Sequence, residues 1–337
     1  MFFLPRAALS STDAWAVGAE PNSSQFLTAP LAEHWDGTQL SIIPTPSISA
    51  PTVQLNSITA LNSSEVWAAG FSDNPNCLCG QTVVEHWNGS SWTRLTTPNP
   101  GVADYLTGVT AISATDIWAV GYEWISNFTE LPLILHYNGT TWKTFNTSQL
   151  QFGLLSSVFA RATNDVWALG WTGLEPNVKA LALHWNGTAW SRVAFPTESG
   201  GSIVLKSVSG VATNDVWAVG SYQFFGLNGN LSLSARSYHW NGSRWTPVTV
   251  GLSGYSFLGS VAAIATDDVW AVGEGLVFPQ PNEFQVTYHW DGTKWSNVTN
   301  PEQGVLNSIS ASSTSDAWAV GDGFATPGTY TLHFSVP

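Results

Sequence analysis

The stretch Asp215-Val-Trp-Ala-Val-Gly220 decides the fold, because its pattern Asp-x-Trp-Ala-x-Gly occurs seven times in the chain. In the second copy Glu65 replaces the Asp. The tryptophans of successive copies lie 52, 51, 49, 50, 53 and 48 residues apart, at Trp15, Trp67, Trp118, Trp167, Trp217, Trp270 and Trp318. A constant period that runs through a whole chain is typical of a repeat protein.

Each repeat predicts four short strands, which we call a, b, c and d in chain order. In the second repeat they are expected at Asn56–Leu61, Val66–Gly70, Thr82–Trp87 and Trp92–Thr96. The pair Asn88-Gly89 separates strands c and d and favours a tight hairpin in which both residues have positive φ. The chain shows no helical periodicity. The sequence therefore predicts an all-β, seven-bladed β-propeller built from four-stranded repeats of about 50 residues.

Because the repeat covers the whole chain, we expect a single β-propeller domain over residues 1–337. Its blades are expected at approximately 1–52, 53–103, 104–152, 153–202, 203–255, 256–303 and 304–337. The seventh repeat reaches Pro337 before any fourth strand, so the last blade is expected to lack its outer strand. Either that blade has three strands or the chain is part of a longer reading frame, and the residues leave both possibilities open.

Composition excludes several classes of function. The chain carries 10 Lys and Arg against 23 Asp and Glu, a formal net charge of −13 that would repel a phosphate backbone, so nucleic acid is not an expected partner. Long apolar runs are absent, and we expect no membrane insertion. Cys77 and Cys79 make neither a disulfide framework nor a full zinc ligand set; an incidental pair, a local disulfide and a metal contact all stay open. We expect a monomer without a metal site or a cofactor.

The repeat resembles a known group of propellers. Strand b ends in Gly, strand c contains an aromatic residue, and strand d has a Trp followed three residues later by an apolar residue, as in Trp92 and Leu95. These features are similar to kelch-type repeats, although the double Gly after strand b is missing and the turn between strands c and d is shorter. The segment Trp185-Asn-Gly-Thr-Ala-Trp190 is more weakly similar to Trp-rich bacterial propeller lectins. Kelch-like folds host scaffolds, lectins and oxidases, so the resemblance implies the fold and not the function.

The repeat also identifies residues that we interpret as structural. All seven histidines occupy one position in strand c, whereas a catalytic or metal-binding His is expected to differ from its equivalents; they are His34, His86, His136, His184, His239, His289 and His333. The Asp that opens strand b is expected to accept hydrogen bonds from turn amides. Seventeen of the 19 tryptophans follow the repeat and are expected to pack between blades.

The candidate site lies where the repeats differ. The interval from the strand b Trp to the strand c His varies from 15 to 22 residues, while the a to b and c to d turns barely change. In a four-stranded meander the b to c and d to a connections share one face of the propeller, and binding loops are expected on that face. Trp124 and Trp171 are the two tryptophans outside the pattern. The candidate ligand-binding residues are Trp124, Trp171, Tyr122, Glu123, Tyr105, Asp104, Glu175 and Tyr222.

Aromatic rings beside carboxylates suit sugars, which offer C–H faces and hydroxyl donors, although the same rings could simply pack the long loops. We therefore expect a non-catalytic binding module for a carbohydrate or another polar ligand. The alternatives are a protein–protein interaction scaffold, and a hydrolase or lyase that uses loop carboxylates such as Asp104 and Glu123. We assign no catalytic residue and lean away from an enzyme. The polar, acidic and Trp-rich composition favours an extracellular or cell-surface protein, bacterial by resemblance, although Met1–Ser11 is poor material for a secretory signal.

Overall fold

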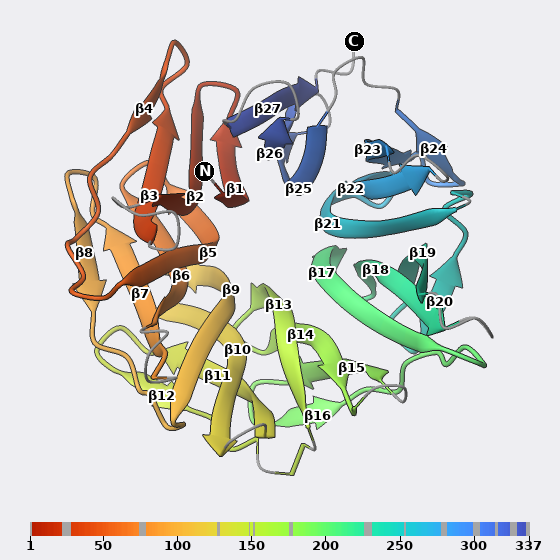
Figure 1. Cartoon of the computed structure of the whole chain (residues 1–337), viewed down its shortest axis with the longest axis horizontal. Helices are drawn as coiled ribbons and strands as arrows, with labels where there is room; N and C mark the ends of the chain where they lie inside the picture. The colour runs from red at the N-terminus through yellow and green to blue at the C-terminus, as the bar shows by residue number, and fades with distance from the viewer. Residues whose placement is uncertain are drawn as a thin grey trace. The chain divides into compact units, whose positions relative to one another are not determined.

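The computed structural model consists of β-strands and their connections (Figure 1). It describes residues 2–21, 28–73, 79–126, 129–147, 149–150, 152–174, 178–225, 231–252, 254–277, 282–298, 304–313, 316–323 and 329–334. These residues form 27 strands and no helix. The all-β prediction is therefore confirmed over the described part of the chain.

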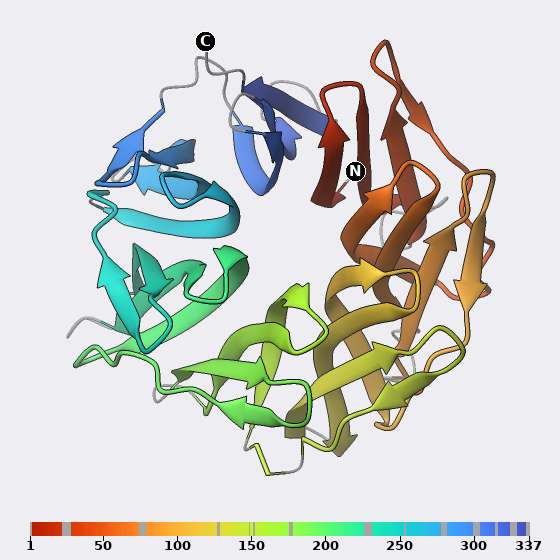
Figure 2. The same cartoon turned by 180° about the vertical axis from the view of Figure 1, so that it is seen from behind.

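The chain divides into two compact units, residues 1–163 and 164–337, and each is described by itself. The first unit contains β1 (Phe2–Ser10), β2 (Asp13–Pro21), β3 (Thr28–Trp35), β4 (Leu40–Ile42), β5 (Thr52–Asn62), β6 (Glu65–Asp73), β7 (Gln81–Trp87), β8 (Trp92–Leu95), β9 (Ala103–Ser113), β10 (Asp116–Ser126), β11 (Thr129–Tyr137), β12 (Trp142–Thr144) and β13 (Gly153–Ala162). Strands β1 to β4 and β5 to β8 are two antiparallel meanders joined by one parallel pairing of Thr28 with Thr52. Strands β9 to β12 form the next four-stranded sheet, which lies beside β5 to β8 (Figure 2).

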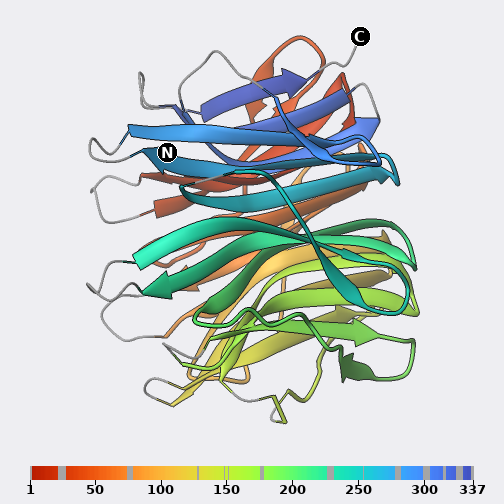
Figure 3. The ribbon, with the colours of Figure 1, turned by 90° about the vertical axis from the view of Figure 1, so that its right-hand side faces the viewer.

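The second unit continues the same order. It contains β14 (Asp165–Thr172), β15 (Lys179–Trp185), β16 (Trp190–Arg192), β17 (Ser202–Ala212), β18 (Asp215–Phe225), β19 (Leu231–Trp240), β20 (Trp245–Val248), β21 (Tyr255–Ala265), β22 (Asp268–Val277), β23 (Asn282–Trp290), β24 (Trp295–Asn297), β25 (Gly304–Ser313), β26 (Asp316–Gly323) and β27 (Thr329–Phe334). Sheets β17 to β20 and β21 to β24 stack on one another (Figure 3). The last sheet has three strands in the described residues, as expected for the seventh repeat.

The recurring Asp, Trp and His form one structural unit. In the third repeat the His136 Nε2 lies 2.8 Å from the Asp116 Oδ1, and the His136 ring stacks on Trp118 with centroids 4.2 Å apart. The same His-to-carboxylate pairing occurs in all seven repeats at 2.6 to 2.9 Å. The Asp thus connects strand b to strand c, a partner that the sequence analysis did not name. The histidines order strand c, in keeping with their structural interpretation.

The Gly that ends the motif makes room for an irregularity in strand a. Strand β17 has a register shift between Leu205 and Ser207 where it pairs with β18. At this point a Cβ on Gly220 would collide with the backbone carbonyl oxygen of Val204. The equivalent collision is found at Gly70, Gly121, Gly273 and Gly321. The motif therefore requires Gly because the bulged neighbouring strand approaches the backbone closely.

The turns between strands c and d are hairpins, as predicted, and the strand ends lie where the sequence placed them. Trp87 pairs with Trp92, so the loop has four residues, and Gly89 adopts φ 89°. The Asn88 Oδ1 accepts the backbone N–H groups of Ser90 and Ser91 at 3.0 Å each. Asn or Asp opens this turn because its side-chain oxygen accepts the hydrogen bonds that a backbone carbonyl would otherwise accept.

Tryptophans pack successive sheets within each unit. Trp217 of strand b contacts Trp290 and Trp295 of the next repeat, with ring centroids 5.0 and 5.4 Å apart. The innermost strands are also linked by hydroxyls, because the Ser207 Oγ accepts the Val261 N–H at 3.2 Å. Equivalent Trp contacts join β2 to β7 and β8 in the first unit.

Candidate functional site

Five of the eight predicted site residues lie together in the first unit. Strand β9 begins and strand β10 ends at the edge that carries the b to c and d to a connections. In the register of these strands Asp104 pairs with Glu123, Tyr105 pairs with Tyr122, and Ala103 pairs with Trp124. We call the group Asp104, Tyr105, Tyr122, Glu123 and Trp124 the β9–β10 cluster.

The aromatic rings of this cluster pack against one another. Tyr105 stacks on Tyr122 with centroids 5.0 Å apart, and Trp124 lies 6.1 Å from Tyr105. On its other side Tyr105 meets Phe71 edge-on at 5.0 Å, and it is only 7% exposed. Tyr122 and Trp124 are half-buried, and the Trp124 Nε1 donates to Glu130 at 3.0 Å. Tyr105 therefore supports the cluster, while Tyr122 and Trp124 offer its accessible ring surface.

Two carboxylates near this edge each have one oxygen that accepts a hydrogen bond and one that does not: Asp73 beside Tyr105, and Asp104 on the other face of β9. The Tyr105 hydroxyl donates to the Asp73 Oδ2 at 3.3 Å, and the Gly101 N–H donates to the Asp104 Oδ1 at 3.1 Å. The Asp73 Oδ1 and the Asp104 Oδ2 are buried without a hydrogen-bond partner among the described residues. Buried carboxylate oxygens normally accept hydrogen bonds, so these two acceptors are suited to an added donor.

Burial also changes the acidity of the cluster. It raises the pKa of Asp104 to about 6, an effect that the nearby Glu123 charge adds to and the Gly101 N–H opposes. Burial likewise raises the pKa of Glu123, and it raises the pKa of Tyr122 to about 12. At neutral pH Asp104 is therefore largely ionised and acts as an acceptor, while Tyr122 keeps its proton and can donate.

The other three predicted residues belong to the second unit. Trp171 lies in β14 opposite Ala180, and Tyr222 lies in β18 opposite Ile203. Glu175 lies outside the described residues. That Trp124 and Trp171 contribute to the same site stays a prediction.

Tyr222 takes part in a charged cluster that the sequence analysis did not identify. The Arg236 guanidinium binds both carboxylate oxygens of Glu198, at 2.8 and 2.7 Å, and lies 5.0 Å from the centroid of the Tyr222 ring. The Tyr238 hydroxyl also donates to Glu198, at 3.0 Å, and the Tyr222 hydroxyl donates to the Ser199 carbonyl at 2.8 Å. These bonds anchor the connection between β16 and β17, and the hydrogen bond from Arg236 holds the pKa of Glu198 below its usual value.

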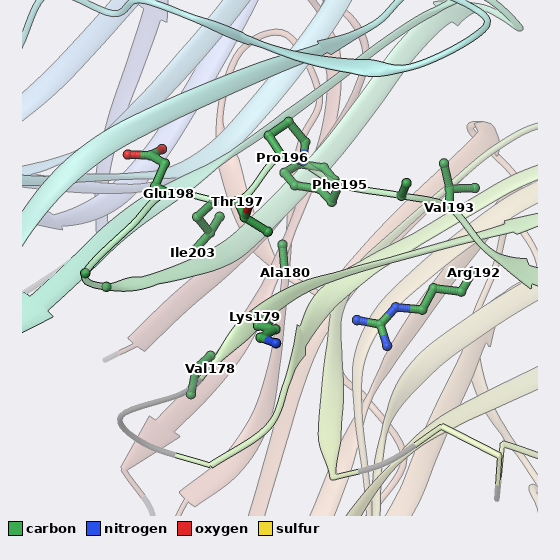
Figure 4. Close-up of a pocket in the computed structure, with 13 residues that line it drawn as sticks. Val178, Lys179, Ala180, Arg192, Val193, Phe195, Pro196, Thr197, Glu198 and Ile203 are labelled. Atoms are coloured by element: carbon green, nitrogen blue, oxygen red, sulfur yellow. The ribbon is translucent and has the colours of Figure 1, made fainter.

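A cavity of about 720 Å³ lies beside this cluster (Figure 4). It opens between the beginning of β15, the end of β16, the connection 193–201 and the beginning of β17. Its walls include Lys179, Ala180, Arg192, Phe195, Glu198 and Ile203. None of the seven predicted residues that the structure describes lines this cavity, although Tyr222 contacts residues at its edge.

One sequence signal could have pointed to the cavity. Arg236 stands four residues before the Trp that ends strand c, where five other repeats have Leu31, Val83, Leu133, Leu181 and Val286. A charge at a repeat position that is otherwise apolar requires a partner. That partner, Glu198, is 38 residues away in the chain, and no spacing rule connects the two.

Three further features bear on function. Among the described side chains, no group of three or more His, Cys, Asp and Glu is placed to hold a metal ion. Cys79 is disulfide-bonded, and the other cysteine of the chain, Cys77, lies outside the described residues. The described residues contain no helix with the length and apolar character needed to cross a membrane.

Comparison with known proteins identifies the class of fold. No protein-family model matches the chain. No curated protein matches it either. Among solved structures, YCF48 bound to D1 peptide is similar with 13% sequence identity and a TM-score of 0.61, over 100% of this chain and 94% of that chain. A GH74 xyloglucanase from Xanthomonas campestris has 11% identity and a TM-score of 0.61, over 99% of this chain and 54% of that chain.

A third similar structure is the extracellular domain of a one-component system from B. thetaiotaomicron. It has 13% identity and a TM-score of 0.58, over 98% of this chain and 37% of that chain. At such low identity these likenesses show the fold alone. The chain is a β-propeller, and the fold predicted from the repeat is confirmed.

Proposed function

We propose that this β-propeller is a non-catalytic binding module that holds a carbohydrate at the β9–β10 cluster. One observation carries the proposal: the stacked rings of Tyr105 and Tyr122 lie beside the Asp73 carboxylate, whose Oδ1 has no hydrogen-bond donor in the described part of the chain. The paired residues Asp104 and Glu123 supply further carboxylates at the same edge, from the other face of β9 and β10. A sugar supplies hydroxyl donors for the carboxylates and C–H faces for the rings.

The surroundings of the cluster support binding at this edge. Val102 and Ile125 flank it and are 57% and 48% exposed, so the half-buried Trp124 is part of a partly apolar surface. The Trp124 Nε1 is fixed by Glu130, which sets the orientation of the ring before a ligand arrives. A kelch-like relationship and an extracellular or cell-surface location are part of this proposal; the first is supported by the repeat motif and the second by the composition.

The experiment is a glycan-array screen of the folded protein, with each hit confirmed by titration calorimetry. We expect a hit whose affinity falls at least roughly tenfold in Trp124→Ala, because a central aromatic contact typically contributes that much. Glu123→Gln keeps the shape of the side chain and is expected to weaken the same hit. Leu40→Ala, which removes an exposed apolar side chain at the start of strand β4, serves as the control and is expected to leave binding unchanged.

The alternatives give different results. Absence of any glycan hit from folded protein, together with a defined protein partner recovered under native conditions, would favour the interaction scaffold. Turnover of a bound oligosaccharide that is lost in Asp104→Asn would favour the hydrolase or lyase. Full glycan binding in both Trp124→Ala and Glu123→Gln would remove the site from the β9–β10 cluster.

A further inference from the structure

We propose that the cavity beside β15 and β17 is a second binding site, which takes a small organic carboxylate with an apolar body. The cavity has about 720 Å³, within the range of roughly 300 to 1,000 Å³ that small-molecule sites occupy. It lies wholly in the second unit and shares no residue with the β9–β10 cluster. The inference is therefore independent of the proposed carbohydrate site.

Two cations face this space, and neither is paired with an acidic side chain among the described residues. Lys179 at the beginning of β15 and Arg192 at the end of β16 direct their charged ends toward one another below the connection 193–197 (Figure 4). Both residues are exposed, and neither forms an ion pair with a described residue. In a chain of net charge −13 with only 10 Lys and Arg, this pairing of cations makes a local site for an anion.

The carboxylate in the cavity wall does not cancel this charge. Both oxygens of Glu198 are bound by the guanidinium of Arg236, and one also accepts from Tyr238. Glu198 is therefore already neutralised by a cation that stands outside the lining. Among the described lining residues, the charges without an ion-pair partner are those of Lys179 and Arg192.

The remaining walls are apolar and rigid. Val193, Phe195, Pro196 and Ile203 line the space, and the Phe195 ring is held by Tyr238 and Trp245 with centroids 4.8 and 5.3 Å away. Such a wall gains from covering an apolar group, and it needs no rearrangement to do so. A ligand that suits both parts has an anionic head and an apolar body.

The repeat provides an internal comparison for this site. The equivalent space in the second repeat has about 320 Å³; there Gln81 stands at the position of Lys179, and Arg94 keeps the cation at the position of Arg192. There Thr97 stands at the position of Phe195, and its hydroxyl lies 2.7 Å from that of Thr82. The first repeat has Ala29 and Ile42 at the two cation positions. The pair of cations is therefore specific to the fourth repeat in the sequence, and its cavity is larger than the equivalent spaces of the first and second repeats.

Titration calorimetry with 4-phenylbutyrate tests the proposal, with the uncharged 4-phenyl-1-butanol as the matched ligand. We expect 4-phenylbutyrate to bind with a dissociation constant of the order of a millimolar or below, and at least roughly ten times more tightly than the alcohol. Arg192→Gln and Lys179→Gln are each expected to weaken 4-phenylbutyrate by about tenfold and to leave the alcohol unchanged.

Arg244→Gln is the control, because it removes one positive charge from a c to d turn of the same unit outside the cavity. It is expected to bind 4-phenylbutyrate as the unaltered protein does. Trp124→Ala is also expected to retain this binding, which separates the cavity from the carbohydrate site. Failure of 4-phenylbutyrate to bind at millimolar concentration would overturn the proposal, and so would equal affinity for the alcohol or equal binding by all variants.

Discussion

Glu85 occupies a position in strand c that five other repeats fill with uncharged side chains, while the first repeat has a second buried glutamate there, Glu33. Leu135, Leu183, Tyr238, Tyr288 and Leu332 stand at the equivalent place, directly before the strand c His. The side chain of Glu85 is fully buried, and neither of its oxygens has a hydrogen-bond partner among the described residues. Burial raises its pKa to about 8, although the charge of Arg94 on the paired strand opposes this.

This carboxyl group is expected to make stability depend on pH. Its pKa is higher in the folded chain, so the folded state keeps a proton that the unfolded state loses between about pH 4.5 and pH 8. The free energy of unfolding therefore falls as pH rises through that window. Glu85→Leu is expected to abolish this fall and to raise the free energy of unfolding at pH 8 by a few kcal/mol, on the order of 2 to 4.

Urea unfolding of both proteins from pH 4.5 to pH 8.5 measures the effect. The low end of the range is an internal control, because there Glu85 is protonated in the folded state and about half protonated in the unfolded state, so its titration contributes little to the difference. Parallel stability profiles across the whole range would contradict the prediction.

Among the elements, the bulged strand a and the Gly of strand b depend on one another. Gly220→Ala places a Cβ against the carbonyl oxygen of Val204, a backbone atom that cannot turn aside. We expect the free energy of unfolding to fall by about 2 to 4 kcal/mol. Gly259→Ala is the matched control, because its nearest neighbour is 3.6 Å away and its effect should stay below about 1 kcal/mol.

Denaturant unfolding of the two variants compares them directly. A cost for Gly220→Ala no greater than that for Gly259→Ala would show that strand β17 can straighten and that the bulge is not a fixed part of the repeat.

The strands were predictable because their signal is repeated seven times. In the second repeat the expected strands coincide with β5, β6, β7 and β8, although β5 and β6 extend beyond the predicted bounds. Their extra residues, such as Thr52 and Asp73, lie at the edge where repeats differ, and variable residues carry no periodic signal. The bulge in strand a was not predictable, because it follows from backbone packing against Gly70 and not from any side-chain alternation.

The two candidate sites differed in how far the sequence pointed to them. Asp104, Tyr105, Glu123 and Trp124 were found because they depart from the repeat and lie near strand ends that pair directly. Their burial, and the Asp104 oxygen that lacks a hydrogen-bond partner among the described residues, could be seen only in the structure. The cavity was missed because it is bounded by a connection between strands d and a that carries no repeat motif. Glu198 of this connection is held by Arg236 of the following strand c, 38 residues away, and sequence spacing does not predict such a contact.

At the scale of the whole molecule, the prediction of one domain over residues 1–337 concerns cooperativity. Repeats that share Trp contacts with the next sheet bury their surfaces only when the neighbour is folded. We therefore expect one thermal transition, with the calorimetric enthalpy equal to the van't Hoff enthalpy.

Differential scanning calorimetry measures both enthalpies in one scan. Two resolved transitions, or a calorimetric enthalpy about twice the van't Hoff value, would show instead that residues 1–163 and 164–337 unfold independently.

The four-residue turns between strands c and d also determine how the protein ages. Asn followed by Gly is the pair most prone to spontaneous deamidation, and it occurs in four of these turns, at Asn88, Asn138, Asn186 and Asn241. Simple hydrolysis would leave Asp there, and Asp36 and Asp291 already open equivalent turns with the same acceptor bonds. The repeat therefore has a precedent for the Asp product, which adds a negative charge while the acceptor bonds of the turn are kept, whereas opening of the cyclic imide to isoaspartate would lengthen the backbone and disturb the hairpin.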